Sequence, residues 1–176
     1  MEAIIGVIGT ILGTILGWIL NSISNSGELK IFVSAWDEQF RCNKTGFMIP
    51  SKCKEQTNNY HYNLVLDLYN SSGEAKIMRN ITVVFSDNKK IIHQSTPKDD
   101  RTERRSGSIY FYDEVGPINI PPKTITQLKL CDDSWNTDGG LDYIWNTQTV
   151  YLTYIDEKDK AREVFIKAED YSHHFD

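Results

Sequence analysis

The sequence has little that could support disulfide, metal or catalytic chemistry. Its cysteines are only three, Cys42, Cys53 and Cys131, and their odd number and wide spacing exclude a zinc ribbon or a disulfide scaffold. Cys42 and Cys53 either pair across a loop in an oxidising compartment or stay free in a reducing one. A Walker loop, a nucleophile elbow, a zinc-protease helix motif and a Cys-x-x-Cys pair are all absent. We therefore expect no enzymatic activity, no cofactor and no metal centre.

A basic excess is also lacking. The 176 residues carry 19 Lys and Arg against 24 Asp and Glu, a net charge of −5. A general nucleic-acid binder normally carries a strongly basic face, so the charge argues against that class. The length allows one domain with a real core and is too short for two comfortable ones.

The N-terminus is a long apolar run. Ala3 to Leu20 contain no charged residue, and eighteen helical residues at about 1.5 Å each nearly match the hydrocarbon thickness of a bilayer. Trp18 lies near the end of the run, where an indole prefers the headgroup level. Only Met1 and Glu2 precede the run, without the positive region of a signal peptide. We predict a retained transmembrane helix over residues 1–21 and a polar linker over residues 22–28.

Small residues follow one face of this predicted helix. They recur three or four positions apart, at Gly6, Gly9, Thr10, Gly13, Thr14 and Gly17. Such a stripe lets helix backbones approach closely in lipid, where hydrophobicity does not drive association. With one span per chain, the expected partner is another copy; the alternative is that glycine is simply common in membrane helices.

The distribution of positive charge suggests an orientation. No Lys or Arg precedes the apolar run, and Lys30 is the first to follow it. The positive-inside tendency therefore predicts a single-pass protein of the cell membrane, with the following domain in the cytoplasm.

From residue 29 onward the sequence is that of a β-domain. Short apolar runs of period two alternate with turn residues, as in Tyr60 to Leu68. We predict an antiparallel immunoglobulin-like sandwich of seven or eight strands over residues 29–170 and a tail over 171–176. Residues 37–59 and 95–108 are expected to be irregular, and residues 135–145 have room for one helical turn.

Parts of this domain resemble known chains. Leu66 to Ser72, Arg79 to Phe85 and Asn119 to Lys123 are similar to recurrent stretches of small, mostly uncharacterised bacterial and phage proteins that have one N-terminal span and an Ig-like domain. The plan also resembles membrane effectors of bacterial anti-phage systems, in which a soluble sensor controls a bundle of spans. That resemblance implies a pore-forming, antiviral role.

Two candidate binding sites stand out in the domain. The first is a cationic loop that contains Lys98, Arg101, Arg104 and Arg105. In an oligomer it would form a ring for an anionic ligand, such as a nucleotide or oligonucleotide; alternatively, Asp99, Asp100 and Glu103 neutralise it. The second is formed by the aromatic residues Trp135, Tyr143 and Trp145, which offer a partner-binding patch if exposed and close one end of the sandwich if buried.

Two acidic clusters have the residue types of metal sites without the spacing. They are a turn with Asp132, Asp133 and Asp138, and a C-terminal group of Asp170, His173, His174 and Asp176. A solvated turn and a frayed tail are the alternatives.

Two functions remain open. In the first, the small-residue face assembles several membrane helices, and the β-domains sense a ligand or partner and set the bundle between closed and conducting. In the second, the span is only a tether for a protein-binding module.

Overall fold

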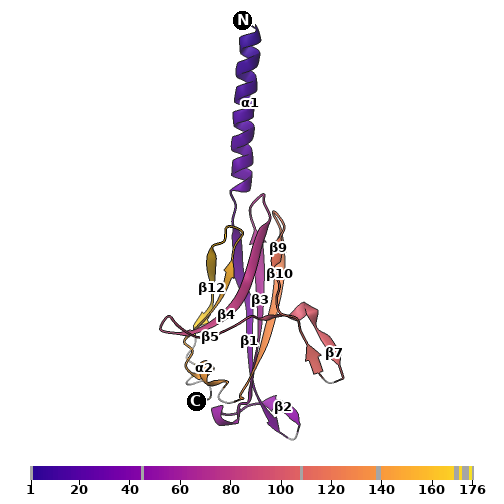
Figure 1. Cartoon of the computed structure of the whole chain (residues 1–176), viewed down its shortest axis with the longest axis vertical. Helices are drawn as coiled ribbons and strands as arrows, with labels where there is room; N and C mark the ends of the chain where they lie inside the picture. Colours follow the sequence, from indigo (N-terminus) through magenta and orange to yellow (C-terminus); the bar gives the residue numbers. More distant parts are fainter. Residues whose placement is uncertain are drawn as a thin grey trace.

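The computed structural model describes residues 2–44, 46–107, 109–137, 140–168, 171 and 175. Within α1, side chains are described at residues 6 and 7 and from residue 9 onward. The chain consists of one long N-terminal helix and a β-domain, with the helix standing clear of the domain at one end (Figure 1).

The elements follow one another with short connections. The helices are α1 (Glu2–Asn25) and α2 (Asp142–Trp145), with the 3-10 turns η1 (Lys54–Gln56) and η2 (Asp100–Thr102). The strands are β1 (Leu29–Lys44), β2 (Phe47–Pro50), β3 (Asn59–Asn70), β4 (Lys76–Asp87), β5 (Lys90–Ser95), β6 (Lys98–Asp99), β7 (Arg104–Ser106), β8 (Ile109–Phe111), β9 (Ile118–Ile120), β10 (Ile125–Trp135), β11 (Thr149–Ile155) and β12 (Ala161–Ala168).

The strands form two main antiparallel sheets. One has the order β2-β1-β3-β10-β6, and the other has the order β12-β11-β4-β5, with β9 also paired to β4. β7 and β8 form a separate hairpin. Asn88 and Lys89 join β4 to β5 with φ values of 46° and 69°, the left-handed geometry that a two-residue hairpin turn requires. The prediction of a mainly β, antiparallel domain is confirmed.

The core lies between the sheets, and alternation along the strands determines which side chains enter it. Every second residue of β3 is buried, from Tyr60 to Leu68. Ile81, Val83 and Phe85 of β4 belong to the same apolar cluster. These are the period-two positions of the sequence, so a local pattern determines the inner face of both sheets.

The predicted strand count of seven or eight is wrong, because the described residues form twelve strands. β1 continues through residues 37–44, which were expected to be irregular, and directs Phe40 and Cys42 inward. The other missed strands β2, β6, β7 and β9 have two to four residues. Strands this short are held by backbone pairing and have no room for a visible alternation. The helical turn expected within residues 135–145 is α2.

Over the part of the chain whose placement is described, no helix combines the length and apolar content of a bilayer-crossing segment.

Candidate functional site

α1 presents large apolar side chains outward. The exposed ones include Val7, Ile11, Leu12, Ile15, Leu16, Trp18, Ile19, Leu20 and Ile23. Trp18 is 72% exposed. None of these residues belongs to the core of the β-domain or packs against it. An apolar surface of this extent, on a helix that stands clear of its domain, is typical of a segment covered by lipid or by another protein chain.

The predicted oligomerisation face of α1 has free space around its glycines. A Cβ added at Gly6, Gly9, Gly13 or Gly17 would meet nothing within 4 Å beyond the helix itself. The two threonines are turned onto their own helix: Thr10 donates from Oγ1 to the Gly6 carbonyl and Thr14 to the Thr10 carbonyl, each at 2.9 Å. The hydroxyls are therefore satisfied within α1, which makes the face compatible with close contact in lipid.

The C-terminal end of α1 is joined tightly to the β3–β4 turn. α1 ends at Asn25, so its last turn includes residues predicted as linker. Glu28 and Ser71 exchange backbone and side-chain hydrogen bonds: the Ser71 N–H donates to the Glu28 carbonyl at 3.0 Å, and the Glu28 N–H donates to Ser71 Oγ at 3.0 Å. Lys123 Nζ adds a bond of 2.6 Å to the Ser71 carbonyl. We call this contact between residues 25–28 and the turn 71–73 the joint.

Glycine makes the joint possible. A Cβ at Gly27 would lie 2.2 Å from the Ser71 carbonyl oxygen and 2.4 Å from the Ser72 nitrogen. A Cβ at Gly73 would lie 2.2 Å from Asn25 Oδ1 and 3.0 Å from the Ser24 carbonyl oxygen. Two backbone segments that are far apart in the sequence thus approach more closely than any side chain would allow.

The turn side of the joint is fixed by one buried amide. Asn70 donates from Nδ2 to the carbonyls of Glu74, Ile120 and Pro121 at 2.8 to 3.0 Å. Its Oδ1 accepts from the Ser72 N–H at 2.9 Å and from the Ser72 hydroxyl at 2.7 Å. Every polar atom of this side chain is therefore satisfied, which makes the turn a rigid base for α1.

A polar pocket of about 300 Å³ lies beside the joint, but its charges are balanced. Lys76 donates to Glu157 at 2.6 Å, and Arg162 Nε donates to Asp156 at 2.8 Å. The pocket therefore presents no excess of either charge that would select an ion.

The cationic loop is largely neutralised by carboxylates. Lys98 lies 3.4 Å from Asp132, Arg101 donates to Asp99 at 2.7 Å, and Arg104 is paired with Asp113. Arg105 donates from Nε to the Gly107 carbonyl at 2.7 Å, and its guanidinium lies 5.4 Å from the Tyr110 ring centroid. Arg101 also holds the pKa of the Asp99 carboxyl below its usual range by hydrogen bonding, against the opposing effect of burial. This arrangement favours the alternative of an internally neutralised loop.

The three candidate aromatic residues do not form one exposed patch. Trp135 is exposed, whereas Trp145 is buried and stacks on Phe40 with ring centroids 5.4 Å apart. Tyr143 is half-buried, and its hydroxyl is hydrogen-bonded to the Ser134 hydroxyl at 2.8 Å. Its ring stacks on the His93 ring with centroids 3.9 Å apart. Trp145 and Tyr143 thus close one end of the sandwich, and Trp135 alone remains on the surface.

The described residues contain no group of three or more His, Cys, Asp or Glu that could hold a metal ion. Asp133 lies 3.1 Å from His61, and Asp132 is the partner of Lys98. The remaining candidates, Asp138 and the C-terminal group, lie outside the described residues. The three cysteines are free thiols, and burial raises the pKa of the Cys131 thiol to about 12, which makes it unreactive.

Sequence reasoning missed the joint and a groove at the far end of the domain. The Asn70-Ser71-Ser72-Gly73 stretch has the residue types of a turn, but nothing local indicates that residues 25–28 dock on it. A contact of this kind depends on where β1 and β3 bring the chain together, with Leu29 opposite Asn70.

Solved structures give only distant similarity. A Bordetella pertussis protein assigned the name ApaA is 11% identical, with 81% of this chain and 91% of that chain covered and a TM-score of 0.38. A protein from Archaeoglobus fulgidus is 10% identical, with 78% and 100% covered and a TM-score of 0.37. TM-scores below 0.5 do not establish a common fold.

Sequence relatives are more informative. The chain is similar to the SPbeta prophage-derived uncharacterized protein YopI of Bacillus subtilis (strain 168), at 26% identity over 168 residues that cover 93% of this chain and 89% of the relative. This supports the predicted resemblance to phage-associated proteins with an Ig-like domain. A family model described as the YopI Ig-like domain matches residues 27–167, from the joint into β12. The chain therefore belongs to the YopI Ig-like domain family.

Proposed function

We propose that this chain is a self-associating, single-pass membrane protein without enzymatic activity, in which the Ig-like domain responds to a ligand or partner and controls a bundle of α1 helices. The observation that carries the proposal is the isolation of α1, which stands clear of the β-domain (Figure 1). Its described large apolar side chains are exposed and do not belong to the core. Contact of such a surface with water is unfavourable, so a covering medium is required.

Lipid is the covering medium that best suits the sequence. The described apolar side chains are joined in the sequence by Ala3, Ile4, Ile5 and Ile8, and no charge interrupts residues 3–20. Since Lys30 is the first basic residue, the β-domain is assigned to the cytoplasmic side of the cell membrane.

Self-association is supported by the open small-residue face. Copies of α1 that pack through Gly9, Gly13 and Gly17 would bring their backbones close together, as small residues allow in lipid. The large side chains on the rest of the helix would then face lipid. A bundle that opens when the domains respond would depolarise the cell, which is the action proposed for an anti-phage effector.

The joint supports control by the domain. Because Glu28 is hydrogen-bonded to Ser71 and Gly27 lies against the Ser71–Ser72 backbone, α1 and β1 are connected without slack. A rearrangement of the domains within an oligomer would then rotate or tilt the α1 helices. A flexible linker would not transmit such a movement from the domains to the helices.

The substitution Gly13→Leu tests the assembly step. Leucine fits within one chain, since nothing lies within 4 Å of that position, but it would separate two helices packed there. We expect crosslinked oligomers of the detergent-extracted protein to be lost, together with any depolarisation measured with a membrane-potential dye during induced expression. Ile15→Leu, on the opposite face, is the matched control. Unchanged crosslinking and unchanged depolarisation in Gly13→Leu would refute the proposal.

The second candidate function is a membrane-tethered protein-binding module without channel activity. It is favoured by the exposed apolar hairpin at the end of the domain remote from α1. Replacing α1 by an unrelated monomeric transmembrane helix separates the two: a tethered module keeps its function, and a self-assembling effector loses it.

A further inference from the structure

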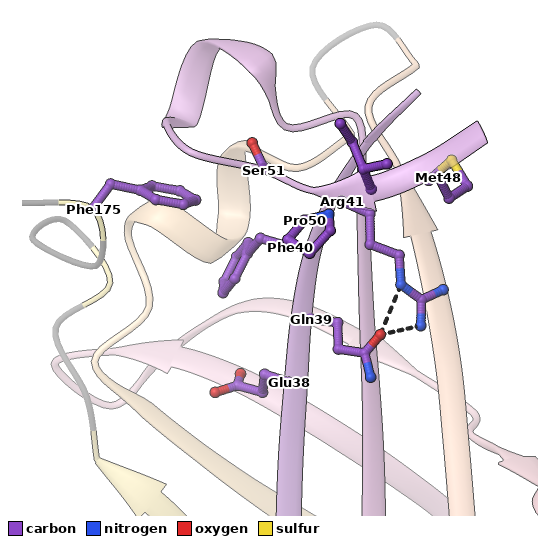
Figure 2. A pocket seen from close by; sticks show the side chains of 9 residues that line it. Glu38, Gln39, Phe40, Arg41, Met48, Pro50, Ser51 and Phe175 are labelled. Atoms are coloured by element: carbon purple, nitrogen blue, oxygen red, sulfur yellow. Dashed lines mark hydrogen bonds between the residues drawn. The ribbon is translucent and has the colours of Figure 1, made fainter. Parts of the chain in front are cut away.

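A groove of about 350 Å³ lies between β1 and β2, and Figure 2 shows the side chains that line it. Figure 1 shows β2 at the end of the β-domain remote from α1. Its lining combines Glu38, Gln39, Phe40 and Arg41 of β1 with Met48, Ile49, Pro50 and Ser51, and Phe175 closes one side. None of the sites predicted from the sequence includes this groove.

The walls of the groove are apolar and partly exposed. Phe40 forms a buried part of the wall, with its ring centroid 5.6 Å from that of Phe175. On the opposite side, Met48 and Ile49 are 38% and 39% exposed, and Phe47 next to them is 74% exposed. Three consecutive exposed apolar residues on one hairpin form an apolar patch, and such patches often mark protein-binding surfaces.

β2 also leaves a sheet edge available. It is the outermost strand of its sheet and, among the described residues, pairs only with β1, from Arg41 opposite Pro50 to Lys44 opposite Phe47. The outer backbone groups of an edge strand can pair with an added extended segment, and side chains at alternate positions of that segment then fill neighbouring pockets.

The charge of the hairpin selects the kind of segment. Residues 38–55 carry four basic residues, Arg41, Lys44, Lys52 and Lys54, against Glu38 and Glu55, in a chain whose net charge is −5. Glu38, which lines the groove, is itself paired with Lys167. Arg41 donates from Nε and Nη2 to Gln39 Oε1 at 2.9 and 2.5 Å (Figure 2), and Lys54 lies 5.4 Å from the Trp145 ring centroid. Within the structure as described, no ion pair joins Arg41, Lys52 or Lys54 to a carboxylate. The positive charge of these three side chains is therefore available to an acidic ligand.

We propose that this groove binds an extended acidic segment of a partner protein, which adds to the edge of β2 and places apolar side chains against Phe40 and Ile49. The inference deepens the proposed function, because it names the chemistry of the partner to which the domain responds. The free edge of β2 favours a peptide over a nucleic acid, because an extended peptide offers backbone N–H and C=O groups along its length and a nucleic acid does not.

Binding to the full chain in detergent micelles tests the proposal. The probe is a capped eight-residue peptide of alternating glutamate and leucine, and it is compared with a lysine–leucine peptide, a single-stranded oligonucleotide of equal charge and anionic lipid vesicles. We expect the acidic peptide to bind and the lysine peptide not to bind. Tighter binding of the oligonucleotide or the vesicles than of the acidic peptide would overturn the proposal.

Variants locate the site. The double variant Arg41→Glu with Lys52→Glu should weaken peptide binding about tenfold or more, since two favourable charge contacts become repulsive. Lys129→Glu, at an exposed position of β10, is the charge control and should leave affinity unchanged. Met48→Pro, which removes the backbone donor that faces the free edge of β2, should also weaken peptide binding. Wild-type affinity in both groove variants would overturn the proposal.

Failure of this proposal is distinguishable from failure of the proposed function. Gly13→Leu disrupts assembly and lies outside the groove, so it should bind the peptide normally if the groove is correctly assigned. Loss of crosslinking with intact peptide binding, or the reverse, separates the two conclusions.

Discussion

At the scale of single residues, the carboxylate of Asp156 shows how one side chain holds a hairpin turn. Its Oδ1 accepts the Lys158 and Lys160 backbone N–H groups, each at 2.9 Å, and its Oδ2 accepts Arg162 Nε at 2.8 Å. Burial raises the pKa of the Asp156 carboxyl, but the hydrogen bonds from Lys160 and Arg162 outweigh burial and bring the pKa to about 2. The charged form is therefore the one that stabilises the fold.

Replacing Asp156 by Asn should lower the free energy of unfolding by about 1–2 kcal/mol at pH 7. The folded pKa lies below the unfolded value of about 3.9, so this stabilisation is complete above about pH 5 and is lost as the pH falls toward 2. Urea unfolding at several pH values checks it: the wild-type advantage should shrink between about pH 4 and pH 2. Asp159→Asn is the control, because its ion pair with Arg79 is exposed; a loss there as large as in Asp156→Asn would contradict the assignment.

The buried amide of Asn70 carries a second prediction. Asn70→Ala leaves the buried carbonyl of Ile120 without this donor and the buried Ser72 N–H and hydroxyl without their acceptor, so unfolding should become easier by about 2–3 kcal/mol. Thermal unfolding of the variant provides the measurement. Asn119→Ala, one residue from the same segment but exposed, should change stability by less than about 0.5 kcal/mol.

At the scale of elements, the joint determines how α1 meets the β-domain. The close approach of Gly27 to the Ser71–Ser72 backbone leaves no room for a side chain. The hydrogen bonds between Glu28 and Ser71 follow directly after α1 and continue into the β1–β3 ladder. Helix and sheet are therefore connected by backbone contacts, which are stiffer than contacts between long side chains.

Gly27→Ala should open the joint. The added methyl overlaps main-chain atoms that have no rotamer with which to yield, and the strain should cost about 1–3 kcal/mol locally. Hydrogen exchange should show faster exchange of the Glu28 and Ser71 amides while the β3–β10 core stays protected. Gly116→Ala has open space around its Cβ and should exchange like the wild type. Unaltered protection of the Glu28 and Ser71 amides in Gly27→Ala would contradict the close backbone contact at the joint.

At the scale of the whole molecule, two exposed apolar surfaces lie at opposite ends of the long axis. One is formed by the described side chains of α1, and the other by the β1–β2 hairpin, which also carries basic residues; Figure 1 shows the two elements at opposite ends. The proposed membrane contact and the proposed partner contact are thus at opposite ends, so one does not obstruct the other.

Removing residues 1–25 should change partitioning and leave the core intact. The full chain should enter the detergent phase of a Triton X-114 separation, because its largest exposed apolar surface is on α1. The shortened chain should stay in the aqueous phase, with a melting temperature within about 5 °C of the full chain, since α1 contributes nothing to the core. A shortened chain that still enters the detergent phase would show that α1 is not the main membrane contact.

Sequence alone determined the elements that depend on local pattern. The apolar run predicted α1, and period-two alternation from Tyr60 to Leu68 predicted β3, because side-chain periodicity is set by backbone geometry within one element. The sequence alone did not decide whether the cationic loop is neutralised by carboxylates. Asp99 could be named as a counter-charge from the sequence, but Asp113 and Asp132 could not, since pairing over such separations depends on β6 joining β10 and β7 joining β8.

Only the tertiary structure decided the remainder. The short edge strands exist because neighbouring backbones offer them hydrogen bonds, and the joint exists because β1 and β3 bring residue 27 against residue 71. The groove between β1 and β2 likewise combines Phe40 with Phe175, two residues that are far apart in the sequence. Contacts of this kind are set by where whole sheets lie relative to one another, and no pattern within a short stretch of sequence records that position.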